Sequence, residues 1–156
     1  MRITIAAVGR AKAGPLRDLY DDYAGRIAEQ ILGKLRLTEV EERRPLPPAA
    51  LMQREAELLL AAVPSGARLI ALDGRGKTLG SEDFAALLRE WRDDGLQDLV
   101  IAIGGAEGLD AVVRRRADLV LSLGPMTWPH LLVRAMIVEQ LFRAQSILSG
   151  HPYHRG

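Results

Sequence analysis

Cysteine is absent from this 156-residue sequence, and aromatic residues make up only 4% of it. The absence of cysteine excludes disulfides, thiol catalysis and cysteine-ligated zinc or iron–sulfur centres. Long apolar runs are also missing, since stretches such as LVIAIGGA fall far short of the roughly 20 residues that span a bilayer. The opening MRITIAAVGR lacks the length and cleavage pattern of a signal peptide. These features favour a cytoplasmic protein.

A strong charge of either sign is missing as well. The net charge of +1 at pH 7 neither indicates nor excludes a nucleic-acid partner, because only clustering of charge on one face would decide that. The composition, with 48% hydrophobic and 26% charged residues, is typical of a globular protein. The chain is about one domain long, so we expect a single domain over residues 1–156.

Apolar patterns of two kinds alternate along the chain. Short β-branched or apolar runs predict strands at 2–8, 34–40, 67–73, 98–103 and 118–123. Helical spacing of apolar residues predicts helices at 16–31, 49–63, 82–94, 111–117 and 130–149. Ser81 is the expected N-cap of the third helix. This alternation indicates an α/β fold, with a mostly parallel sheet that carries helices on both faces.

Three loops rich in glycine or proline follow apolar strands, namely LDGRGK (72–77), IGGAEG (103–108) and LGPMTWP (123–129). Because the carboxyl ends of parallel strands meet at one edge of a sheet, we expect the three loops to lie together. Glycine allows close approach of a ligand to the backbone, whose N–H and C=O groups recognise an adenine edge or a carboxylate. A single such loop is commonly only a turn, but three together favour a pocket.

Two common nucleotide motifs are incomplete here. ALDGRGKT has Ala71 where the phosphate-binding loop has its first glycine, and the helix expected after Ser81 begins too late to place Lys77 at its N-terminus. GGAEG lacks the spacing of the dinucleotide fingerprint. A nucleotide triphosphatase and an NAD enzyme are therefore disfavoured, and a nucleoside-type ligand held mainly by backbone groups remains.

The segments LDGRGK, IGGAEGLD and above all MTWPHLLVRAMIVEQLFRAQSILSGHPYHR resemble the small bacterial SPOUT-class methyltransferases that modify pseudouridine in large-subunit ribosomal RNA. The resemblance covers essentially the whole chain; it is specific from Leu72 onward and loose before residue 65. Two departures stand out. Trp128 replaces a smaller apolar residue or phenylalanine, and the connection EERRPLPP has mixed charge where relatives are often lysine-rich.

The resemblance implies a C-terminal trefoil knot, a homodimer, and S-adenosyl-L-methionine bound by the knotted loops. The implied cofactor-binding residues are Leu72, Gly104, Gly105, Leu123, Gly124, Pro125, Met126, Thr127 and Trp128. All of them lie in the three loops described above. The implied reaction is methyl transfer to N3 of a pseudouridine in 23S rRNA of the assembled ribosome, with no membrane and no metal involved.

Methyl transfer from a sulfonium depends on alignment of donor and acceptor, and removal of the weakly acidic N3 proton calls for a base or a stabilising cation. His130 directly follows the MTWP loop and is the first candidate base, although a histidine at a helix start is equally suited to capping. Arg134 lies one helical turn beyond it and is a candidate for neutralising the anion or a phosphate.

The terminal HPYHRG alone is typical of a solvated tail. The resemblance matches it to the family's terminal motif and implies that the tail covers the partner's pocket in a dimer. We therefore expect Tyr153 to bind the flipped base, Arg155 to contact phosphate or base, and His151 to help bind the substrate. His154 is a second candidate for proton transfer.

Other arginines and the last helix are candidates for contact with RNA and with a second subunit. Arginines at 43–44 and 114–116 are candidates for RNA phosphate contact, although such runs are commonly solvated surface. The apolar arc of the last helix is wide enough to face both its own sheet and a second subunit. Alternative functions are methylation of a tRNA base, an inactive ribosome-binding module, and a small nucleotide-binding hydrolase.

Overall fold

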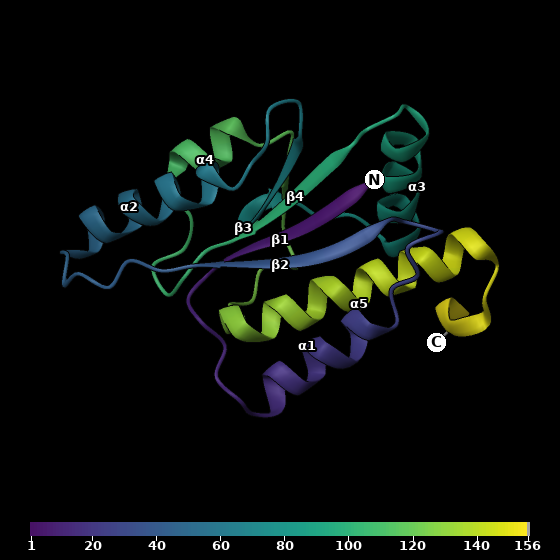
Figure 1. The fold of residues 1–156 in the computed structure, drawn as a ribbon, viewed down its shortest axis with the longest axis horizontal. Helices are drawn as coiled ribbons and strands as arrows, with labels where there is room; N and C mark the ends of the chain where they lie inside the picture. Colours follow the sequence, from purple (N-terminus) through teal and green to yellow (C-terminus); the bar gives the residue numbers. More distant parts are fainter. Residues whose placement is uncertain (156) are drawn as a thin grey trace.

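The computed structural model describes residues 1–155 and contains a five-stranded sheet (Figure 1). The strand order is β2-β1-β4-β3-β5, and every pair of neighbouring strands is parallel. The strands are β1 (Arg2–Val8), β2 (Lys34–Val40), β3 (Arg68–Lys77), β4 (Asp98–Ile103) and β5 (Leu119–Leu121). The expected α/β fold with a parallel sheet is thus confirmed.

Helices cover both faces of this sheet (Figure 1). They are α1 (Pro15–Gly25), α2 (Pro48–Ala61), α3 (Ser81–Asp93), α4 (Ala111–Arg116) and α5 (His130–Ser149), followed by a 3-10 turn, η1 (Pro152–Arg155). α2 and α4 pack on one face, and α1, α3 and α5 pack on the other. None of the helices in residues 1–155 is long and apolar enough to cross a membrane.

The two faces of the sheet differ in the size of their side chains. Isoleucines at neighbouring register positions, Ile5, Ile70 and Ile101, are fully buried under α1, α3 and α5. Each contributes roughly 1.5–3 kcal/mol by leaving water. On the other face, small residues such as Ala6 and Ala102 let α2 and α4 approach the sheet closely. The larger core therefore lies on the side of α5.

The first helix is shorter than predicted, since α1 ends at Gly25 and not at residue 31. The buried side chain of Gln145, on α5, replaces the missing helical bonds. Its Oε1 accepts from the Ala28 N–H at 2.7 Å, and its Nε2 donates to the Arg26 carbonyl at 2.9 Å. The amide of Gln145, which is distant in sequence, thus holds residues 26–28 against α5. Local spacing of residues does not predict this contact.

Other boundaries also differ from the prediction, and β5 is shorter than the predicted 118–123. β3 continues through the expected loop to Lys77, which pairs with Leu121 after a register shift that follows Leu72. Gly80, not Ser81, is the N-cap of α3, because Ser81 is already helical and its hydroxyl donates to Gln140 Oε1 on α5 at 2.7 Å. The predicted bounds of α5 are confirmed, and Gly150, whose φ is +73°, caps its C-terminus.

Candidate functional site

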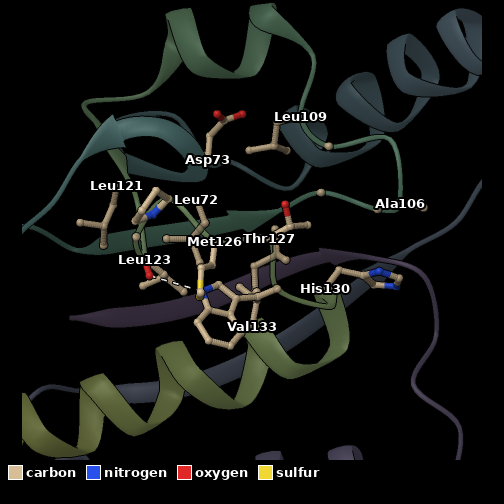
Figure 2. Close-up of a pocket in the computed structure, with 18 residues that line it drawn as sticks. Leu72, Asp73, Ala106, Leu109, Leu121, Leu123, Met126, Thr127, His130 and Val133 are labelled. Atoms are coloured by element: carbon tan, nitrogen blue, oxygen red, sulfur yellow. Dashed lines mark hydrogen bonds between the residues drawn. The ribbon is translucent and has the colours of Figure 1, made fainter.

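A pocket of about 310 Å³ lies at the carboxyl edge of the sheet (Figure 2), within the size range of small-ligand sites. It is lined by all the residues that the resemblance implies for the cofactor: Leu72, Gly104, Gly105, Leu123, Gly124, Pro125, Met126, Thr127 and Trp128. The structure thus brings the three predicted loops together. Asp73, in the predicted loop 72–77, also lines the pocket without having been assigned to the cofactor, and sequence reasoning missed Leu109 and Val133.

The glycine turn after β4 leaves little room for a side chain at Gly104 or Gly105. A Cβ on Gly104 would lie 2.7 Å from the carbonyl atoms of Gly108, and one on Gly105 would lie 3.0 Å from Val8 Cγ1. Gly108 has a φ of +80° and donates its N–H to the Gly105 carbonyl at 3.0 Å. Glycine is therefore needed for the turn to fold back and to present its backbone to the pocket.

Arg114 does not line the pocket, but its side chain contacts two of the three loops. Its Nη1 donates to the Leu109 carbonyl at 2.6 Å and lies 3.4 Å from Asp73 Oδ2. Arg116 is similarly engaged, since it donates to the Ala67 carbonyl and pairs with Asp118. Two arginines of the 114–116 run therefore stabilise the fold. Two of their four partners, Asp73 and Ala67, are more than 40 positions away in the sequence, so the run itself did not reveal this role.

The third loop exposes large apolar side chains at the rim of the pocket. Met126 is 72% exposed and Trp128 is 39% exposed. The indole Nε1 of Trp128 donates to the Leu123 carbonyl at 3.4 Å (Figure 2). Gly124, with a φ of +107°, donates its N–H to Ser122 Oγ at 3.1 Å. The rim is thus an uncovered apolar surface, the kind that marks contact with a partner or ligand.

His130 begins α5 and lines the pocket, at the end away from Leu121 in Figure 2. Its Nε2 lies 3.9 Å from the position of a Cβ on Gly9. Burial lowers the pKa of the imidazole, and the positive charge of Arg134 lowers it further. His130 is therefore neutral at neutral pH, which is the form that accepts a proton.

Arg134 is 2% exposed; its Nη1 and Nη2 are engaged within the fold, whereas its Nε is buried with no hydrogen-bond partner among residues 1–155. Its Nη1 donates to Glu39 Oε2 at 2.7 Å, and its Nη2 donates to the carbonyls of Val8 and Gly9 at 3.0 and 2.8 Å. Burial alone would raise the pKa of Glu39, but hydrogen bonds from Arg134 and Ala11 bring it below its ordinary value. Arg134 thus fixes the end of β1 and lines a separate cavity of about 150 Å³.

The terminal residues lie at the other end of α5. The Tyr153 hydroxyl donates to Glu139 Oε1 at 3.0 Å and lies 3.3 Å from the Tyr23 hydroxyl, while its ring packs on Phe142. His154 Nδ1 lies 2.7 Å from the His151 carbonyl oxygen, and Arg155 is exposed. Within one chain, the tail residues predicted for the substrate are therefore not brought to the pocket of His130.

A larger cavity, of about 620 Å³, opens between α1, α3 and α5. Its lining includes Leu19, Phe84 and Met136, and Leu19 is 39% exposed. The wide apolar arc predicted for the last helix accounts for Met136, whereas sequence reasoning missed the contributions of α1 and α3. No cluster of three potential metal ligands occurs in residues 1–155.

The chain is similar to known proteins over its whole length. The family model described as a predicted SPOUT methyltransferase matches residues 1–154. Proteins named "Ribosomal RNA large subunit methyltransferase H" from Paramagnetospirillum magneticum and Rhodospirillum centenum are 58% and 57% identical over 155 residues, covering 99% of both chains in each comparison. A probable methyltransferase from Bordetella pertussis Tohama I shares the fold, with a TM-score of 0.53 and 18% identity over 92% of this chain and 95% of that one.

Proposed function

The chain belongs to the SPOUT methyltransferase family, and on that premise we propose that it transfers a methyl group from S-adenosyl-L-methionine to N3 of a pseudouridine in the 23S rRNA of the assembled ribosome. The observation that carries this proposal is the convergence of three loops on one pocket beside His130. The names of the full-length relatives support ribosomal RNA as the substrate. The enzyme acts as a single domain in the cytoplasm, where ribosomes are found.

The pocket suits a nucleoside-type cofactor with a polar tail. Leu72, Ile103 and Leu109 provide apolar walls for an adenine ring, and the backbone of the glycine turn provides N–H and C=O groups for polar edges. S-adenosyl-L-methionine supplies an activated methyl group on a sulfonium. The chain itself has to hold donor and acceptor in line and exclude alternative orientations.

His130 is the residue that takes the N3 proton in this proposal. It lines the pocket, and its lowered pKa keeps the imidazole in the accepting form. Arg134 does not line the pocket; its contacts with the carbonyls of Val8 and Gly9 hold the backbone that faces His130. We therefore assign Arg134 a positioning role. His154 remains the second candidate for proton transfer.

The tail reaches a pocket only if two copies of the chain combine. The tail folds back on α5, and the Tyr153 hydroxyl rests on Glu139, nine residues beyond His130, or about 14 Å along the helix at 1.5 Å per residue. In a homodimer, Tyr153, Arg155 and His151 of one copy cover the pocket of the other. The apolar cavity lined by Leu19 and the exposed apolar rim of the pocket support a dimer interface on the side of the molecule where they lie. The trefoil knot is part of the same proposal and rests on the family resemblance.

The test is transfer of labelled methyl from S-adenosyl-L-methionine to intact ribosomes, separated large subunits and bulk tRNA, all from cells that lack this protein. The full-length chain is compared with a chain that ends at Gly150. The proposal requires label in the rRNA of intact ribosomes, lost with the truncation. Label in tRNA would identify a different acceptor. Cofactor binding without label in any RNA would identify an inactive ribosome-binding module.

A further inference from the structure

A buried carboxyl group lies behind the glycine turn of the pocket. Glu55, on α2, is only 8% exposed, and its Oε1 is buried with no hydrogen-bond partner in the described part of the chain. Its Oε2 lies 3.2 Å from the position of a Cβ on Gly105. Glu55 does not line the pocket itself. The carboxyl group therefore contacts the back of the turn whose front faces the ligand.

The surroundings of Glu55 favour the neutral form of its carboxyl group. Burial raises its pKa, and the negative charge of Glu107, on the glycine turn, raises it further. Val8 faces the same space from β1 and is apolar. On α2 itself, Arg54 donates to Glu57 at 2.8 Å and to Glu42 at 3.1 Å. No cation in residues 1–155 therefore offsets the cost of a buried negative charge at Glu55.

Ionisation of Glu55 would change the turn. A buried carboxylate needs water or N–H donors, and its Oε1 has neither a donor nor contact with solvent in this conformation. Gly105 lies close to Oε2, so water that solvates a carboxylate there would compete with the turn for this space. The charge would also repel Glu107 on the same turn. The turn therefore sits closest to α2 when Glu55 is neutral, and it moves outward when the group is charged.

We propose that Glu55 is a positioning residue for the cofactor, whose neutral carboxyl group holds the turn 104–108 in its binding conformation and whose ionisation releases it. This inference rests on the proposed function, because it takes the pocket to be the cofactor site. If Glu55 is neutral more often in the cofactor-bound protein than in the free protein, binding of the cofactor takes up a proton. Affinity then falls as pH rises through the range in which Glu55 ionises.

The experiment is calorimetric titration of the full-length protein with S-adenosylhomocysteine from the ordinary glutamate pKa of about 4.5 up to about pH 8.5. For the wild-type protein we expect at least a threefold loss of affinity toward high pH, equivalent to about half a pKa unit between free and bound forms. Glu55→Gln mimics the neutral acid permanently. It should bind at high pH about as tightly as the wild type does at low pH, with no such fall.

Two further variants provide controls. Glu57→Gln changes an exposed carboxylate on the same helix, which pairs with Arg54, and should follow the wild type. Glu107→Gln removes the charge that raises the pKa of Glu55 and should move the fall in affinity to lower pH; because Glu107 is exposed, this variant should fold normally. Titration of the ligand's own amino group is common to all four proteins and cancels between them.

The outcomes separate this inference from the proposed function. Wild-type affinity that does not change with pH would overturn the role of Glu55, as would a Glu55→Gln protein that is folded but keeps the wild-type pH dependence or binds more weakly throughout. Wild-type protein that binds no S-adenosylhomocysteine at any pH would overturn the proposed cofactor site, and the inference with it.

Discussion

The two ends of α5 each carry an arginine–glutamate pair, but the pairs differ in what they hold. At the first end, Arg134 is 2% exposed and joins α5 to β2 through Glu39 at 2.7 Å. In the second half of α5, on the side of the tail, Arg143 contacts Glu139 at 2.6 Å on the same helix, and both are about one-fifth exposed. The first pair connects elements distant in sequence, whereas the second forms a local platform on which Tyr153 rests.

The same contrast extends to the chemistry at each end. The first end has the pocket, the neutral imidazole of His130 and an apolar rim at Met126 and Trp128. The second has an aromatic ring, histidines and an exposed arginine, close to the chain terminus. Each end holds one part of the proposed site. Two chains with opposite ends of α5 in contact would complete the site. Variants that separate the pocket from the tail therefore test this division.

The largest effect should come from separating the two ends onto different chains. Gly105→Val places side-chain atoms against Val8 and Glu55, behind the glycine turn, and so displaces the turn that lines the pocket, while a chain ending at Gly150 lacks the tail. Each protein alone should be inactive on ribosomes. After subunit exchange in equal amounts, half of the dimers combine both chains, and each has one intact pocket served by the tail of its partner. About a quarter of wild-type activity should return.

The outcome distinguishes a tail that acts on the partner from one that acts on its own chain. If each tail served its own pocket, every intact pocket in the mixture would lack its tail, and no activity would return. Circular dichroism and sedimentation of the separate chains control for loss of folding or of dimers. Activity of the truncated chain alone would remove the tail from the site altogether.

Substitution of His130 should have the next largest effect. Loss of a general base typically costs 10²–10⁴-fold in rate, so we expect a loss of about that size in kcat for His130→Ala, with little change in cofactor affinity. Because burial and Arg134 lower the pKa of His130, wild-type kcat should rise with pH, with a midpoint below the ordinary histidine value of about 6.5, and then level off.

The matched control for His130 is the other candidate, His154. Single-turnover rates of both alanine variants on ribosomes, measured against pH, assign the proton transfer. If His154→Ala alone removes the acidic limb of the profile, His154 is the base. Proton transfer would then belong to the tail and not to the pocket end of α5. A small rate loss in both variants would indicate that alignment of the donor and acceptor is enough for catalysis.

The two arginine pairs should differ in their contribution to stability. Arg134→Met leaves Glu39 without its partner at the edge of the core and frees the carbonyls of Val8 and Gly9. Breaking a buried pair typically costs about 3–5 kcal/mol. Arg143→Met removes a partly exposed pair within one helix, worth about 1 kcal/mol or less. Urea unfolding of the two variants checks this, and equal losses would contradict the difference in burial.

The same two ends show what sequence reasoning could and could not predict. The bounds of α5 follow from local signals, namely apolar spacing and the terminal Gly150. The three loops could be grouped because parallel strands place their carboxyl ends at one edge. In contrast, Arg134 reaches a glutamate 95 positions earlier and Gln145 an amide 117 positions earlier. Neither partner can be chosen from spacing, since only packing of the layers brings these groups together.

The smallest effect concerns the hydroxyl group of Tyr153. Burial and the hydrogen bonds with Tyr23 and Glu139 raise its pKa, so it remains a donor to Glu139 throughout the neutral range. Tyr153→Phe removes these bonds and keeps the ring against Phe142. We expect docking of the tail onto α5 to weaken by about 1–2 kcal/mol, detected as faster amide exchange at residues 151–155, while kcat changes less than for Tyr153→Ala. If the tail must leave its own helix to cover the partner's pocket, the weaker docking should slightly favour RNA binding. A Phe variant as inactive as the Ala variant would show that the hydroxyl, not the ring, meets the substrate.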